Sequence, residues 1–206
     1  MNWKATLATA ALVSVAAFTA QAGVLLNDNF DTENGGVGQL NYNGFANFTV
    51  ANAGSGGAVD LIGNGSFDFY PGNGLYVDMC GSSTACGVLT TNQVFGPGTY
   101  TITIDLGGNA RFVGSDTTLV NFGTFSGSYS LTETQQQTET ATVTLTSPSQ
   151  LAISDGGAFG ADVGNILFSV NVATAAVPEP AAWTLMLVGF GGLGAMLRRR
   201  ARPTFA

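Results

Sequence analysis

The stretch "TYTITIDL", residues 99–106, decides the fold that this chain adopts. Every second residue from Tyr100 to Leu106 is large and apolar, and the residues between them are polar. A period of two is typical of a β-strand with one face in a core and the other in water. The pattern recurs in "TATVTLTS" (140–147) and in "NILFSVNVA" (165–173). In the latter, the residues expected to point inward are Ile166, Phe168, Val170 and Val172.

Further candidate strands fill residues 23–176, among them "SFDFY" (66–70) and "ARFVG" (110–114). Gly, Asn and Asp separate nearly all of these segments and supply the positive φ angles that tight turns require. Few windows of ten residues avoid Gly, Asn, Thr and Ser, so no long helix is expected there. The region therefore predicts an all-β ectodomain, a jelly-roll-type β-sandwich of roughly eight to eleven strands.

The composition removes several classes of function. The 206 residues include no histidine, which excludes a His-dependent triad, a His metal site and a His general base. Within residues 23–176, twelve acidic residues and one basic residue, Arg111, give a formal charge of −11. Nucleic acid is therefore an unsuitable partner. An acidic surface of this kind suits solubility, cations and neutral ligands.

Residues 1–22 have the features of a secretory signal peptide. One lysine, Lys4, precedes an uncharged run that extends to Phe18. Ala20 and Ala22 then fit the small-x-small rule for signal peptidase, so cleavage is expected after Ala22. A retained membrane helix is the alternative, although the run is short for a bilayer span.

A second apolar segment, residues 181–197, carries no formal charge and is about long enough to cross a bilayer. Arg198, Arg199 and Arg200 follow it directly, and the positive-inside rule keeps them in the cytoplasm. The terminal segment 177–202 is thus predicted to hold a single transmembrane helix, at about 181–197, and a basic tail at 198–202.

The residues that precede this helix suggest a more specific interpretation. Pro178, Glu179 and Pro180, with Trp183 three residues after the second proline, precede a Gly-rich helix and the arginines. This combination resembles the PEP-CTERM sorting signal in its tryptophan-containing subtype, although Thr184 stands where that subtype usually has alanine. A plain single-span anchor is the alternative.

The resemblance implies processing near the Pro-Glu-Pro tripeptide by an exosortase, a membrane enzyme of bacteria that make exopolysaccharide. The chain would be the substrate of that enzyme and would carry none of its catalytic residues. It would be held transiently in the inner membrane by the C-terminal helix, with the ectodomain in the periplasm. Delivery to the cell surface or the extracellular matrix would follow.

Cys80 and Cys86 are the two cysteines of the chain and enclose five residues. In an exported protein such a pair predicts a disulfide that closes a small loop. A redox site is not expected, because the spacing is not C-x-x-C and no neighbouring base would lower a thiol pKa.

The ectodomain resembles the galactose-binding-like and carbohydrate-binding-module-like β-sandwiches. The matching stretches are "NDNFDTEN" (27–34), "GPGTYTITIDLGG" (96–108) and "DGGAFGADVGN" (155–165), although "LFSVN" lacks the Asp-Asn pair common in the last strand of relatives. The resemblance implies a structural calcium ion, for which Asp28, Asp31 and Asp162 are the candidate ligands. Solvated turn aspartates are the alternative, and no other cofactor is required.

Sugar binding has its own candidate residues, because sugars stack on exposed rings and bond to nearby polar side chains. They are Tyr42, Tyr70, Tyr76 and Arg111, which lie at loop or strand ends. Each ring has an alternative interpretation as part of the core. The segment "TETQQQTET" (132–140) is interpreted as a polar hairpin tip.

No pair of carboxylates is singled out for catalysis, so a non-enzymatic role is expected. The predicted function is structural or adhesive, within an exopolysaccharide matrix. A lectin-like carbohydrate-binding module and a degenerate glycoside hydrolase are the two alternatives. The expected partners are an exosortase, the inner membrane and exopolysaccharide.

Overall fold

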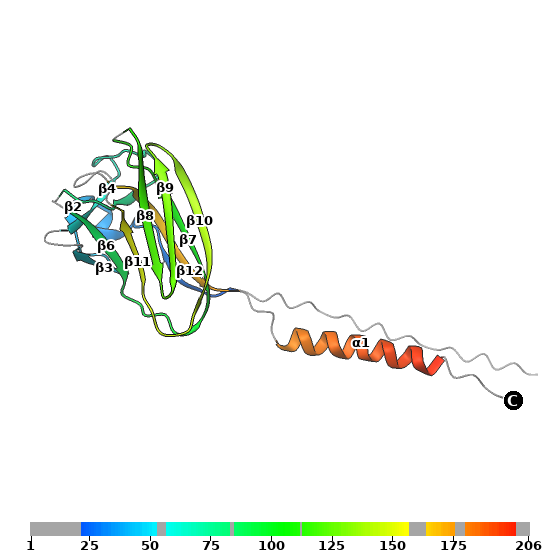
Figure 1. The fold of residues 1–206 in the computed structure, drawn as a ribbon. Coiled ribbons are helices and arrows are strands. Elements are labelled where there is room, and N and C mark those ends of the chain that lie inside the picture. The colour runs from blue at the N-terminus through cyan, green and yellow to red at the C-terminus, as the bar shows by residue number, and fades with distance from the viewer. Residues whose placement is uncertain are drawn as a thin grey trace, which may run out of the picture. The chain divides into compact units, whose positions relative to one another are not determined.

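A computed structural model describes residues 22–52, 57–82, 85–111, 113–156, 164–175 and 180–200. The β domain spans Ala22–Ala175, and the C-terminal helix belongs to a separate unit. The prediction of an all-β sandwich is confirmed (Figure 1). The strands of the described residues are β1 (Val24–Asp28), β2 (Gln39–Tyr42), β3 (Phe48–Asn52), β4 (Gly57–Gly63), β5 (Leu75–Asp78), β6 (Ala85–Thr91), β7 (Gly98–Gly107), β8 (Ser115–Phe122), β9 (Phe125–Thr132), β10 (Gln136–Leu145), β11 (Leu151–Asp155) and β12 (Ile166–Thr174). A short 3₁₀ turn, η1 (Glu33–Gly36), follows β1.

The strands form two layers. One layer has the order β10-β7-β12-β5-β4, with β2 beside β4 and β1 beside β12. The other has the order β9-β8-β11-β6, with β3 beside β6. A short parallel pairing of β4 with β6 joins the layers on one side. On the opposite side β10 and β9 are the last strands of their layers.

The alternation that decides the fold appears directly in β7 and β10. Tyr100, Ile102, Ile104 and Leu106 are buried, and the residues between them are half-buried on the outer face. β7 pairs with β10 over ten consecutive residues without a register shift. Because directly opposed residues share a face, the threonines of both strands form one polar outer surface. The predicted inward residues of "TATVTLTS" are confirmed, since Val143 and Leu145 are buried and Ala141 packs against the core.

The predicted pattern of β12 is wrong at two residues, Ile166 and Phe168. The register of β12 against β7 shifts between Leu167 and Ser169, which is the mark of a β-bulge. Leu167, Val170 and Val172 belong to the main core, whereas Ile166 and Phe168 lie outside it. The Phe168 ring is half-buried in a second, smaller apolar cluster.

Two further strand predictions are wrong for a backbone reason. Most of "SFDFY" and the described part of "ARFVG" lie in turns. Phe67 has a φ of 48° and Ala110 a φ of 55°, values that a β-strand does not tolerate. The sequence of each segment is rich enough in aromatic or branched residues to resemble a strand, but the local turn overrides that preference.

The C-terminal segment forms a helix, α1 (Pro180–Arg200), which begins at the second proline of the Pro-Glu-Pro tripeptide. Proline is well suited to the first position of a helix, because no helical hydrogen bond needs its missing N–H. Within the described part of the chain, no helix combines the length and the apolar character that crossing a membrane requires.

Candidate functional site

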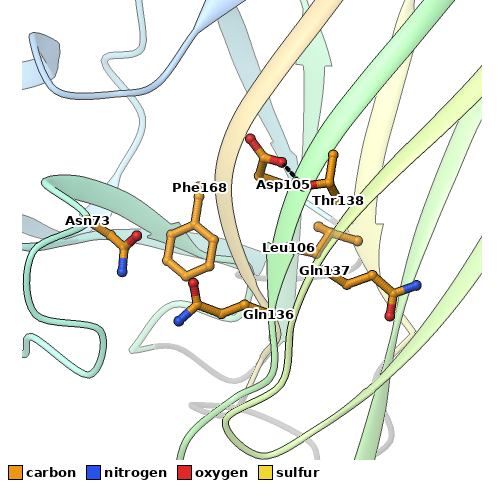
Figure 2. Close-up of a pocket in the computed structure, with 7 residues that line it drawn as sticks. All are labelled: Asn73, Asp105, Leu106, Gln136, Gln137, Thr138 and Phe168. Atoms are coloured by element: carbon orange, nitrogen blue, oxygen red, sulfur yellow. Dashed lines mark hydrogen bonds between the residues drawn. The ribbon is translucent and has the colours of Figure 1, made fainter.

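The outer face of the first layer carries a cavity of about 270 Å³. It opens where the beginning of β10 passes the end of β7 and the beginning of β12 (Figure 2). The lining side chains combine one aromatic ring with polar groups: Asn73, Asp105, Leu106, Gln136, Gln137, Thr138 and Phe168. An aromatic ring beside a few amides and hydroxyls is the usual composition of a sugar-binding surface. This group of residues is called the Phe168 pocket below.

The β-bulge of β12 places the ring in this pocket. Tyr70 and Tyr76 hold Phe168 by edge-to-face contacts, with ring centroids 5.1 Å and 5.4 Å away. Such contacts favour one ring orientation over others. The ring also lies directly above Gly107 of β7, which leaves space for it because glycine has no side chain.

Amide side chains reach the pocket from two segments. Gln136 and Gln137 are exposed at the start of β10, and exposed Asn73 belongs to the turn before β5. Figure 2 shows the amides of Asn73 and Gln136 near the ring of Phe168. Gln137 donates to Glu139 and accepts a bond from Gln135, so its amide is held in place.

Asp105 of β7 is the one charged side chain among the described residues that line the pocket. The Thr138 hydroxyl donates to Oδ1 and the Ser169 hydroxyl donates to Oδ2, each over 2.6 Å. Both partners are neutral, so the carboxylate keeps its negative charge uncompensated by them. Each carboxylate oxygen accepts more than one hydrogen bond, so further acceptor capacity remains for a ligand.

The structure buries the three tyrosines that the sequence offered as sugar-stacking rings. Tyr42, Tyr70 and Tyr76 are 7%, 5% and 0% exposed. Burial raises the pKa of Tyr70 and of Tyr76 to about 12. The expectation of exposed rings at these positions is therefore wrong, and the alternative of core tyrosines is correct. Tyr70 and Tyr76 instead support Phe168 from below, as described above.

Arg111 does not join the Phe168 pocket. It forms an ion pair with Asp78, and its guanidinium lies 5.0 Å from the centre of the Phe69 ring. Asp78 is 1% exposed, and burial raises its pKa to about 8 against the opposing effects of Arg111 and the Cys80 N–H. This ion pair gives Arg111 a structural role, because the guanidinium offsets the negative charge of a buried carboxyl group.

Asp28 and Asp31, two of the three candidate calcium ligands, accept hydrogen bonds from amides. Asp28 accepts from the Phe30 N–H at 2.8 Å, and Asp31 from the Leu75 N–H at 2.9 Å. These are the contacts of carboxylates that order turns. Asp162 lies outside the described residues, so the calcium site stays a prediction.

The disulfide between Cys80 and Cys86 is confirmed, with Cα atoms 3.9 Å apart. It lies beside the Arg111 ion pair, since the Cys80 N–H donates to Asp78. The loop that it closes connects β5 to β6, which belong to the first and second layers respectively.

The terminal signals are described in part. Ala22 begins the described chain and is exposed, whereas Ala20, Pro178 and Glu179 lie outside the described residues. Pro180, Trp183 and the three arginines Arg198, Arg199 and Arg200 belong to α1.

Several residues of the Phe168 pocket were missed from the sequence. The sequence predicts a polar hairpin tip at Gln136 and Gln137, and it predicts a place in the core for Phe168. The run of three glutamines at 135–137, next to a strand end, was the available signal. The bulge that turns Phe168 outward has no such signal in the sequence, because it depends on pairing with β7.

Known proteins resemble this chain in two regions, the β domain and the C-terminal segment. Several solved structures share the β-sandwich fold. The K3 adhesin domain of Lys-gingipain from Porphyromonas gingivalis matches with a TM-score of 0.52 and 18% identity, over 74% of this chain and 99% of that one. The xylan-binding domain CBM22-1 of Xyn10C from Paenibacillus barcinonensis matches with a TM-score of 0.50 and 12% identity, over 78% and 99%.

Some solved structures are matched over only part of their length. The chain covers 50% of the tandem CBM22-1-CBM22-2 domain of the same Xyn10C, with 81% of this chain included, 14% identity and a TM-score of 0.51. It spans 29% of an exo-β-1,3-galactanase from Phanerochaete chrysosporium. At these identities the likeness establishes the fold alone.

The family model of the PEP-CTERM protein-sorting motif matches residues 176–200. The chain therefore carries the sorting motif that the sequence indicated, which is the mark of exported proteins processed by an exosortase. No curated protein matches the sequence.

Proposed function

We propose that this chain is a non-catalytic surface or matrix protein whose β domain binds polysaccharide at the Phe168 pocket. The observation that carries the proposal is the half-buried ring of Phe168, held in place by Tyr70 and Tyr76 and surrounded by exposed amides. A fixed ring offers its face to the apolar side of a sugar, while the amides bond to the hydroxyls. The role is adhesive, because the pocket retains a polymer without changing it.

The sorting motif supports the location of this role. Exosortase processing near Pro178 would deliver the β domain to the cell surface or the matrix, where exopolysaccharide is abundant. The solved structures of similar fold include a xylan-binding domain and an adhesin domain, which is compatible with a binding role here.

Affinity measurements on two variants test the binding site. The purified chain is screened on a glycan array, and the best ligand is then titrated by calorimetry. Gln136→Ala should weaken binding about fivefold, the value of one net hydrogen bond. Phe168→Leu keeps an apolar side chain but removes the aromatic face, and should weaken binding by about tenfold.

Thr142→Ala is the matched control, because Thr142 is exposed on the same strand as Gln136 but does not line the pocket. Its affinity should equal that of the unmodified chain. Equal affinities for all three variants, or an array without any selective ligand, would overturn the proposal.

The sorting part has a separate test. The intact mass of the protein from its native cell surface is compared with that from a host that lacks exosortase. Loss of the residues after the Pro178 region in the native host alone is the expected result. An intact Ala206 terminus in the native host would contradict exosortase processing.

A further inference from the structure

We infer that the polysaccharide bound at the Phe168 pocket is cationic, a polymer of amino sugars with free amino groups. The inference rests on the proposed function and adds the chemical class of the ligand. A sugar ammonium group presents a positive charge and three hydrogen-bond donors, as a lysine ammonium does. It therefore requires a site that is rich in acceptors and negative in charge.

The pocket provides such a site. Asp105 is its charged member, and the amide oxygens of Asn73 and Gln136 are further acceptors near the ring. The hydroxyls of Thr138 and Ser169 fix the Asp105 carboxylate from both sides. They orient the charge without neutralising it, so the carboxylate is ready to accept a bond from an ammonium group.

The charge of the whole domain acts in the same direction. Residues 23–176 carry a formal charge of −11, and the one cation among them is Arg111. Arg111 is already engaged with Asp78, away from the lining of the Phe168 pocket. An approaching polyanion, such as a polymer of uronic acids, would be repelled by this field, whereas a polycation would be attracted.

Aromatic recognition is also compatible with the positive charge. A cation near the face of a ring is attracted by the ring quadrupole. Phe168 thus serves both the apolar face of a sugar and a nearby ammonium group. A neutral sugar would use the ring and the amides but would leave Asp105 with a smaller role.

The test uses three oligosaccharides of equal length and linkage. They are a glucosamine oligomer, its fully N-acetylated form and the corresponding glucose oligomer, each titrated into the full chain at 50 mM and 500 mM salt. We expect the glucosamine oligomer to bind at least tenfold more tightly than the other two at low salt. The preference should shrink at high salt, because salt screens the charge interaction.

Two variants locate the effect. Asp105→Asn should remove the preference for the free amine, so that the ratio of the affinities for the glucosamine and glucose oligomers falls to about one. Glu133→Gln changes the net charge equally, but Glu133 lies in the turn between β9 and β10 and its side chain does not line the Phe168 pocket. It should retain the preference.

The outcomes separate the two levels of the argument. Equal binding of all three oligomers would overturn the inference and leave polysaccharide binding standing. Equal loss of the preference in Asp105→Asn and Glu133→Gln would show a diffuse charge effect and would also overturn it. Absence of binding to any oligomer and to every array glycan would overturn the proposed function itself.

Discussion

Gly107 and Phe168 lie so close on neighbouring strands that a β-carbon on Gly107 would stand 2.8 Å from the phenyl ring. Gly107 is the last residue of β7, and Ile166 of β12 lies opposite it. The same β-carbon would also stand 3.2 Å from the Tyr70 ring. The position of the Phe168 ring thus depends on a residue without a side chain on the adjacent strand.

Gly107→Ala is therefore expected to move the ring and weaken polysaccharide binding. Overpacking of this kind destabilises a domain by about 1–3 kcal/mol. Urea denaturation measures the free energy of unfolding, and titration with the array ligand measures the affinity. Gly96→Ala is the control, since a β-carbon there would have no neighbour within 4 Å. A Gly107→Ala protein with the stability and affinity of the control would refute the assigned role of Gly107.

Removal of Arg111 should destabilise the protein more at pH 9 than at pH 6. Asp78 has a raised pKa of about 8, so at pH 6 its carboxyl accommodates the loss by holding a proton. At pH 9 the Asp78 carboxylate stays charged in the interior without its partner. This unpaired charge lowers the free energy of unfolding by about 2 kcal/mol, after allowance for the partial exposure of Arg111. Thermal unfolding of Arg111→Ala at both pH values measures the difference. The double variant Arg111→Ala/Asp78→Asn should show no such pH effect; if it does, Asp78 is not the cause.

The stability of the unmodified protein should fall as the pH rises from about 4 to about 8. In this range the folded protein holds a proton on Asp78 that the unfolded chain has released, because burial raises the folded pKa above its ordinary value. The stabilising effect is full below the unfolded pKa and is lost as the pH passes the folded pKa. One proton corresponds to a slope of up to about 1.4 kcal/mol per pH unit.

Asp78→Asn isolates this contribution. Urea denaturation across the pH range should give a flatter profile for the variant than for the unmodified protein. Identical profiles would mean that another group controls the pH dependence.

Replacement of both cysteines by serine should cost about 2 kcal/mol, since the disulfide closes a small loop. Unfolding in urea measures the cost for the Cys80→Ser/Cys86→Ser protein. A thiol assay on the unmodified protein, unfolded without a reducing agent, should detect no free thiol. Reduced and oxidised protein of equal stability would show that the loop is held by other contacts.

The sequence predicted the fold well wherever one face of a strand meets the core and the other meets water. The alternation in β7 and β10 follows directly from that contrast, and so do the burial of Ile102 and Val143. The disulfide and the sorting motif were equally accessible, because each depends on residue type and spacing along the chain.

The pocket was less accessible because its features depend on contacts between distant segments. Phe168 has the spacing of a core residue, and only the bulge against β7 moves it out of the main core. Tyr70 and Tyr76 are aromatic residues of the type on which sugars stack. In the structure, however, Phe168 packs against both rings, so they support Phe168. Register shifts and ring packing are properties of strand pairs, and a single strand sequence does not encode them.

The pairing of the first strand with the last gives the domain a mechanical property. The Phe168 ring and the exit of the chain at Thr174 both belong to β12, about 20 Å apart at the usual rise of an extended strand. Between them β12 pairs with β7 on one side and with β1 on the other. In a chain held by its C-terminal segment, tension applied by a polymer at Phe168 would run along this one strand. It loads two hydrogen-bonded ladders in shear, where all bonds resist together, and leaves most of the sandwich outside the path of the force.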